Sequence, residues 1–230
     1  MKLVFIHGSG NTGEVWHYQV EYFADTDAVY LPGHLAPGEP CVSVEDYTDW
    51  LHDYIIERKY SDLVVIGHSL GSAIAQIYAL KYPQDIKALI LVGAGARLRV
   101  APQFLSLIRD GIKNPSAWLE DFVKPRYGQV ASDVRDIIIE KIAQLGAEVQ
   151  LNDMLCCDAF DIMDRVDHIN VPTLIICGTE DQMTPPKYGS YLAAKIEGAE
   201  FVTIDGGSHL VFAEKPEVFN QAIEQFLRKL

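Results

Sequence analysis

The sequence predicts an α/β fold built on a mostly parallel, six-stranded sheet flanked by helices. Short apolar runs typical of strands buried on both faces alternate with helical patterns along the chain. This alternation requires parallel strands joined by right-handed crossovers, so helices cover both faces of the sheet. The strands are expected at residues 3–6, 28–31, 63–66, 88–92, 173–177 and 201–204.

The third strand runs into the segment Gly67-His68-Ser69-Leu70-Gly71, and an Ala/Leu-rich helix follows directly. A strand-to-helix turn this sharp brings neighbouring backbone close, so we expect that only glycine fits at Gly67 and Gly71. It also holds Ser69 in a strained conformation, with its hydroxyl exposed at the carboxyl end of a parallel strand. The pattern therefore indicates a serine nucleophile.

Residues 97–167 break the alternation, because they contain amphipathic helical pieces and no strand signal. About seventy residues exceed what one crossover needs, and long excursions of this kind commonly form lids or binding elements. We therefore expect an α/β core made of residues 1–96 and 168–230 with a helical cap insertion at 97–167. Phe104 and Trp118 are candidates for its pocket wall, although a place in the helical core is the more common role for such residues.

Two further residues, Asp181 and His209, follow strand ends as Ser69 does. The carboxyl ends of parallel strands share one edge of a sheet, so these three side chains are expected to converge there. His209 would act as general base toward the Ser69 hydroxyl, and Asp181 would orient the imidazole and stabilise its charged form. Other histidines and acids in the corresponding loops leave alternatives open for both roles: His7, His34 and His68 as base, and Glu180 and Asp205 as acid.

Acyl transfer also needs N–H donors aimed at the developing oxyanion. The backbone of Leu70, directly after the nucleophile, supplies one donor, and Ser9 in the loop after the first strand is placed to supply the second. We further expect Gly8, His68 and Leu210, which adjoin these groups, to contact the substrate together with Phe104 and Trp118.

The glycines of this first loop permit a rival interpretation. Gly8, Gly10 and Gly13 match the spacing of a dinucleotide-binding loop. That motif also requires an acidic residue at the end of the second strand, where this chain has Pro32-Gly33-His34. Close approach of the backbone to an oxyanion explains the glycines without a dinucleotide, and we expect no cofactor.

Composition narrows the possible partners. With 19 basic and 32 acidic residues the chain has a net charge of −13, which disfavours binding to nucleic acid or to anionic membrane surfaces. Four cysteines, two of them adjacent, show neither a disulfide framework nor zinc-ligand spacing. No apolar run is long enough for a signal peptide or a membrane span, so a cytoplasmic location and no metal site are expected.

Five motifs together resemble the α/β-hydrolase fold family over essentially the whole length of the chain. They are His7-Gly8 with Trp16, Leu31-Pro32-Gly33-His34, the Ser69 turn, Gly178-Thr179-Glu180-Asp181 before Pro185-Pro186, and Gly207-Ser208-His209. The resemblance implies an oxyanion hole at Ser9 and Leu70 and a helical cap before the acid-bearing strand. Because the chain begins almost directly at the strand before His7, it is similar to the compact esterase and hydroxynitrile-lyase branch.

We therefore expect a serine hydrolase that cleaves a small carboxylic ester through an acyl-enzyme, acting as a monomer or homodimer. A serine at position 69 argues against a role like that of the dehalogenases or epoxide hydrolases. Thioester hydrolysis, carbon–carbon bond hydrolysis and lyase chemistry stay open on the same residues, as does a small-molecule receptor on a hydrolase scaffold. A lysine or other charge in the pocket would favour a lyase or an anionic substrate.

Overall fold

The computed structural model describes all residues, 1–230, and contains one sheet of six parallel strands, as predicted. The strand order is β2-β1-β3-β4-β5-β6, so the chain starts near the centre and winds outward in both directions. The direction of winding therefore reverses between β1 and β3, and in such folds ligands bind at the carboxyl ends of the strands beside this point. The strands are β1 (Lys2–Ile6), β2 (Thr26–Val29), β3 (Leu63–His68), β4 (Ile86–Val92), β5 (Thr173–Gly178) and β6 (Glu200–Ile204).

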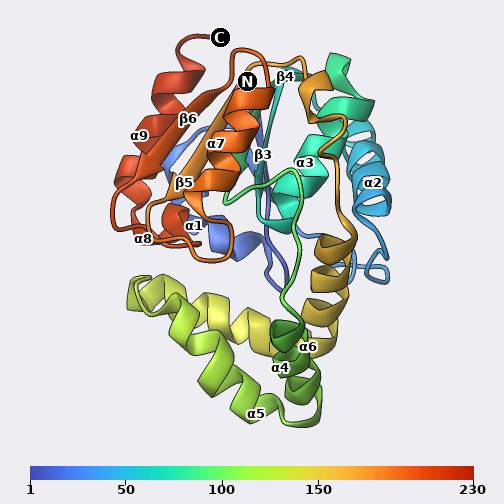
Figure 1. Ribbon diagram of the computed structural model, residues 1–230, viewed down its shortest axis with the longest axis vertical. Coiled ribbons are helices and arrows are strands. Elements are labelled where there is room, and N and C mark those ends of the chain that lie inside the picture. The colour runs from blue at the N-terminus through green and yellow to red at the C-terminus, as the bar shows by residue number, and fades with distance from the viewer.

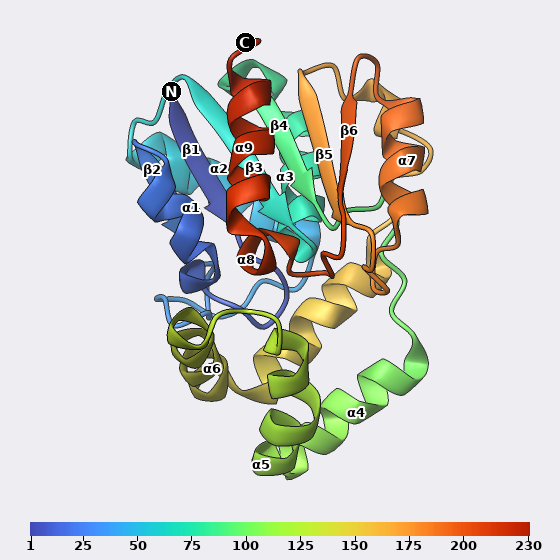
Figure 2. The same cartoon turned by 90° about the vertical axis from the view of Figure 1, so that its left-hand side faces the viewer.

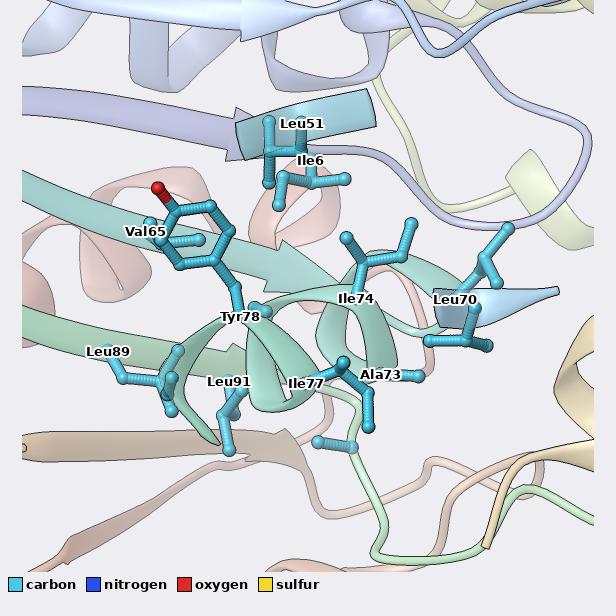
Figure 3. Packing of buried hydrophobic residues seen from close by; sticks show 14 of the residues in the cluster. Ile6, Leu51, Val65, Leu70, Ala73, Ile74, Ile77, Tyr78, Leu89 and Leu91 are labelled. Atoms are coloured by element: carbon cyan, nitrogen blue, oxygen red, sulfur yellow. The ribbon is translucent and has the colours of Figure 1, made fainter. Parts of the chain in front are cut away.

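Helices cover both faces of the sheet (Figure 2). One face carries α2 (Val44–Glu57), α3 (Leu70–Lys81) and α7 (Pro186–Lys195); the other carries α1 (His17–Tyr22), α8 (Val211–Glu214) and α9 (Pro216–Leu227). Successive side chains of a strand point to opposite faces, so β1 contributes Ile6 to the first layer and Phe5 to the second. Figure 3 shows Tyr78 of α3 beside Val65 of β3 in the first layer.

The second strand differs from the prediction, because β2 covers Thr26–Val29 rather than 28–31. Its residues pair in register with 3–6 of β1 at the sheet edge. An edge strand has one open side, so it tolerates the polar Asp27, whose carboxylate accepts hydrogen bonds from the hydroxyls of Tyr54 and Tyr60. Because the strand begins with the polar residues Thr26 and Asp27, the apolar pattern of the sequence does not indicate its start.

Residues 97–167, named the cap segment from here on, fold into helices that lie across the carboxyl ends of the strands (Figures 1 and 2). Both chain termini lie at the opposite end of the molecule. The longest helix bends at Gly146, whose φ of 82° interrupts the helical conformation. The elements are α4 (Pro102–Lys113), α5 (Pro115–Ala117), the π-helix η3 (Trp118–Val123), the 3-10 helix η4 (Lys124–Tyr127), α6 (Ser132–Ala159) and the 3-10 helix η5 (Val166–His168).

None of the helices combines the length and the apolar character that crossing a membrane requires.

Candidate active site

Ser69 lies at a strained turn between β3 and α3. Its φ of 51° and ψ of −113° fall outside the regions that non-glycine residues ordinarily adopt. The flanking glycines are sterically required: a Cβ on Gly67 would lie 2.1 Å from the carbonyl oxygen of Gly71, and a Cβ on Gly71 would lie 2.3 Å from that of Ile6. Close packing of α3 against β1 therefore fixes the turn that presents the serine.

Asp181 and His209 meet at the same edge, from the loops after β5 and β6. His209 Nδ1 lies 2.8 Å from Asp181 Oδ2. The other carboxylate oxygen accepts hydrogen bonds from the backbone N–H groups of Met183 and Thr184, both at 2.9 Å. The Thr184 hydroxyl donates to Asp181 Oδ2 at 2.8 Å and lies 3.2 Å from His209 Nδ1. These bonds hold the carboxylate facing the imidazole.

The surroundings of Asp181 favour its ionised form. Burial by itself raises the pKa of this carboxyl, but the charge of His209 and the hydrogen bonds from His209 and Thr184 outweigh burial and lower it. An ionised Asp181 accepts the Nδ1–H of His209, which leaves Nε2 as the free, basic nitrogen of the neutral ring. That Nε2 is buried and has no hydrogen-bond partner within the protein.

Ser69 and His209 line one cavity of about 430 Å³ between the sheet edge and the cap segment. The Ser69 hydroxyl and His209 Nε2 are not hydrogen-bonded to each other here; such bonds are often long without substrate and shorten in the Michaelis complex. Four other residues predicted to contact the substrate or to form the oxyanion hole also line the cavity, namely Ser9, His68, Phe104 and Leu210.

Two residues predicted to contact substrate do not line this cavity. Trp118 is buried within the cap segment, where its indole N–H donates to Gln150 Oε1 at 3.0 Å and its side chain packs on Gly111. Gly8 lies behind the lining, since a Cβ there would come within 2.7 Å of the His68 ring. The structure thus gives Trp118 a role in the cap core and Gly8 a role in close packing of the loop.

The expected oxyanion donors face no competing acceptors. The N–H of Ser9 donates to no backbone carbonyl, and Leu70 begins helix α3, whose first N–H groups have no acceptor within the helix. The positive end of α3 therefore adjoins the Ser69 hydroxyl. The Ser9 hydroxyl lies 3.5 Å from the Cys157 thiol of α6, so this side chain is directed at the cap segment.

A buried polar cluster that the sequence does not reveal joins the cap segment to the loop after β1, which carries Ser9. Asp153 of α6 is fully buried, and its Oδ2 accepts from the backbone N–H of Gly10 at 2.8 Å. The same oxygen lies 2.8 Å from His34 Nε2, and Oδ1 accepts from the Tyr47 hydroxyl at 3.1 Å. Asp153 therefore links α6 to the backbone directly after Ser9.

The three alternative bases each have other partners. His34 bonds Asp153 through Nε2 and the Pro32 carbonyl through Nδ1, at 3.0 Å. His7 bonds the Gly8 carbonyl and the Leu31 N–H, and burial holds its pKa well below the ordinary value. These contacts use both ring nitrogens of each histidine for the fold.

His68 packs beneath His209, with ring centroids 4.6 Å apart, and its Nε2 lies 2.9 Å from the His209 carbonyl oxygen. Burial lowers the pKa of His68 well below the ordinary value, and the neighbouring charge of His209 lowers it further. A neutral His68 donates from Nε2 to that carbonyl and supports the loop that carries His209.

Neither alternative acid contacts His209. Glu180 is exposed, and the carboxylate of Asp205 lies 3.5 Å from the Thr179 hydroxyl.

A second feature missed from the sequence is Arg126 of η4, which lines the cavity from the cap side. Its guanidinium carbon lies 3.3 Å from the ring centroid of Phe122 and 4.6 Å from that of Phe104. The next residue, Tyr127, is buried, and its hydroxyl donates to Asn11 Oδ1 at 2.7 Å. The turn that carries Arg126 is thus anchored to the loop after β1.

No group of three or more histidine, cysteine, aspartate or glutamate side chains is arranged to hold a metal ion.

Comparison with known proteins decides the family. The model of the alpha/beta hydrolase family matches residues 3–222. The chain belongs to the alpha/beta hydrolase family. A solved thermophilic esterase, 32% identical, aligns with a TM-score of 0.84 over 99% of this chain and 90% of its own.

Curated relatives also match almost the whole chain. The (E)-2-((N-methylformamido)methylene)succinate hydrolase of Acinetobacter baylyi is 26% identical over 240 residues, covering 98% of this chain and 89% of the relative. Protein ABHD8 of Homo sapiens is 26% identical over 245 residues, covering 98% of this chain and 54% of the relative. The chain therefore spans about half the length of that relative.

Proposed function

We propose that this protein is a serine hydrolase that cleaves a small carboxylic ester through an acyl-enzyme. The observation that carries the proposal is the hydrogen bond that His209 donates to Asp181, which leaves Nε2 of the ring free while His209 and the strained Ser69 line the same cavity. Membership of the alpha/beta hydrolase family and the 32% identity to an esterase support it.

In the first step the Ser69 oxygen attacks the ester carbonyl carbon while His209 Nε2 takes the hydroxyl proton. The carbonyl π electrons move onto oxygen, and the N–H groups of Ser9 and Leu70 stabilise this oxyanion. Asp181 keeps its charge and stabilises the imidazolium. Collapse of the intermediate breaks the bond to the alcohol oxygen, which leaves with the proton from His209.

The second step repeats this chemistry with water. His209 takes a proton from the water molecule as its oxygen attacks the acyl-enzyme, and it returns the proton to Ser69 as the acid is released. Neutral His209 is regenerated, so the cycle consumes only ester and water. The same residues fit thioester cleavage, but the likeness to an esterase favours the oxygen ester.

A panel of p-nitrophenyl esters of increasing acyl length tests the proposal. We expect saturable turnover by the wild type and a loss of about 10⁴-fold or more in Ser69→Ala, because the nucleophile is removed. Ser190→Ala, an exposed serine on α7, is the matched control and should retain wild-type rates. Equal turnover by Ser69→Ala and wild type would show that another group performs the reaction.

A further inference from the structure

The cap segment places an arginine without an acidic partner in the wall of the catalytic cavity. Arg126 is half-buried, and no aspartate or glutamate forms an ion pair with it. Burial lowers the pKa of its guanidinium to about 10, which still leaves the group charged at neutral pH. Buried charges in proteins are ordinarily paired, so a desolvated guanidinium with no carboxylate beside it has unused capacity for an anion.

Most of the N–H donors of Arg126 have no acceptor within the protein. One nitrogen, Nη1, donates to the Phe122 carbonyl at 2.6 Å. A guanidinium has five N–H donors, and this is its one hydrogen bond to the protein. Contact with the ring faces of Phe122 and Phe104 restricts the plane of the group, and such a fixed fork suits bidentate binding of a carboxylate.

The negative groups of the cavity lie on the side of the β5 and β6 loops rather than on the cap. Glu214 uses both carboxylate oxygens to accept from Ser208, one from its backbone N–H at 2.6 Å and one from its hydroxyl. Glu180 is exposed to solvent. Arg126 is the one arginine of this cavity, and no lysine lines it, so the cavity has a single cationic position on its cap side.

We propose that Arg126 binds a carboxylate of the substrate, so that the preferred substrates are esters carrying one further carboxylate, such as half-esters of dicarboxylic acids. That the bound molecule is an ester rests on the proposed function. One guanidinium matches one singly charged planar group. A cavity of about 430 Å³ holds such a molecule with one end at Ser69.

Matched substrates test the carboxylate directly. Monomethyl succinate, glutarate and adipate are compared at pH 8 with the corresponding methyl ester amides, which have the same shape but no charge. We expect the wild type to prefer at least one half-ester by about tenfold or more in kcat/KM. Arg126→Gln should lower this half-ester to amide ratio about 10- to 100-fold, mainly through KM, since a charge-assisted bond is lost.

Two further variants sharpen the comparison. Arg109→Gln removes an exposed arginine of α4 outside the cavity and should leave the ratio unchanged. Arg126→Lys keeps the charge without the planar fork and should retain part of the preference. A wild type with no preference for half-esters, or an unchanged ratio in Arg126→Gln, would overturn the assignment.

Binding without turnover separates this inference from the proposed function. In a Ser69→Ala background, calorimetry measures binding of monomethyl succinate, glutarate and adipate with and without Arg126→Gln. We expect about tenfold or greater weakening when the arginine is removed. If no ester is turned over but this weakening is found, the proposed ester hydrolysis is wrong and the carboxylate site stands. If esters are turned over but the half-esters bind equally well with and without Arg126, the ester hydrolysis stands and the carboxylate site is wrong.

Discussion

The backbone N–H of Gly10 donates to the Asp153 carboxylate at 2.8 Å, although 143 positions separate the two residues. This bond joins α6 of the cap segment to the loop that carries Ser9, so the cap helps to position the expected oxyanion donor. Asp153 itself does not line the cavity and has no hydrogen bond to Ser69, so we expect it to act as a positioning residue.

Replacing Asp153 should therefore affect kcat more than KM. We expect Asp153→Ala to lower kcat about 10- to 100-fold, because displacement of the loop weakens transition-state stabilisation. It should also lower the free energy of unfolding by about 3 kcal/mol, since His34 and Gly10 lose a buried partner. Asp136→Asn, an exposed change on the same helix, should alter neither quantity. Equal kcat in Asp153→Ala and wild type would contradict the positioning role.

The His34–Asp153 pair predicts a pH-dependent stability. Burial by itself lowers the pKa of His34, but the charge and hydrogen bond of Asp153 outweigh burial and raise it above 6.5. A raised folded-state pKa stabilises the protein fully below the unfolded value of about 6.5, and this stabilisation is lost as pH rises through the folded value.

Urea unfolding of wild type and Asp153→Asn measures this effect. The difference in unfolding free energy between them should be larger at pH 6 than at pH 9, because asparagine cannot hold His34 in its charged form. A difference that stays constant over this range would mean that His34 does not gain a proton on folding.

Thr184 offers a graded test of the Asp181–His209 pair. Thr184→Val removes the hydroxyl that donates to Asp181 Oδ2 but preserves the backbone N–H that binds Oδ1. We expect kcat to fall several-fold, far less than the roughly 10⁴-fold expected for Asp181→Asn, which favours the wrong His209 tautomer. Steady-state kinetics on one ester checks the order, and a larger loss in Thr184→Val than in Asp181→Asn would contradict it.

Gly71 of the serine turn and Gly206 of the loop after β6 should differ in how much a substitution by alanine lowers the free energy of unfolding. Gly71→Ala would place a methyl group 2.3 Å from the Ile6 carbonyl oxygen, so we expect a loss of about 3 kcal/mol in unfolding free energy. Gly206→Ala, where φ is 64° and no atom lies within 4 Å, should cost about 1 kcal/mol. Chemical denaturation of both variants measures the contrast, which similar losses at the two positions would refute.

The sequence was sufficient to predict the sheet and the residues at its edge, because both depend on local patterns. Buried apolar runs identify the strands, and residues that follow parallel strand ends necessarily share one edge. The prediction for Ser69, Asp181 and His209 rests on this rule, and the structure places all three at that edge. The edge strand β2 was misplaced because its polar start, Thr26-Asp27, is tolerated only by its position at the sheet edge.

The contributions of the cap segment could not be predicted. Asp153 and Arg126 lie in segments with ordinary helical composition, and their importance depends on which distant residues the packing brings beside them. Trp118 was expected in the pocket, but its burial against Gly111 depends on how η3 packs on α4. A side chain in an isolated helix gives no sign of whether it faces a cavity or a neighbouring helix.

The most direct test of the central claim, that His209 activates Ser69 for nucleophilic attack, is intact-mass measurement after treatment with a fluorophosphonate probe. We predict one adduct per chain, located on Ser69 by peptide mapping, absent in Ser69→Ala and formed far more slowly in His209→Gln. An unlabelled wild type, or labelling at the same rate in His209→Gln, would contradict the account.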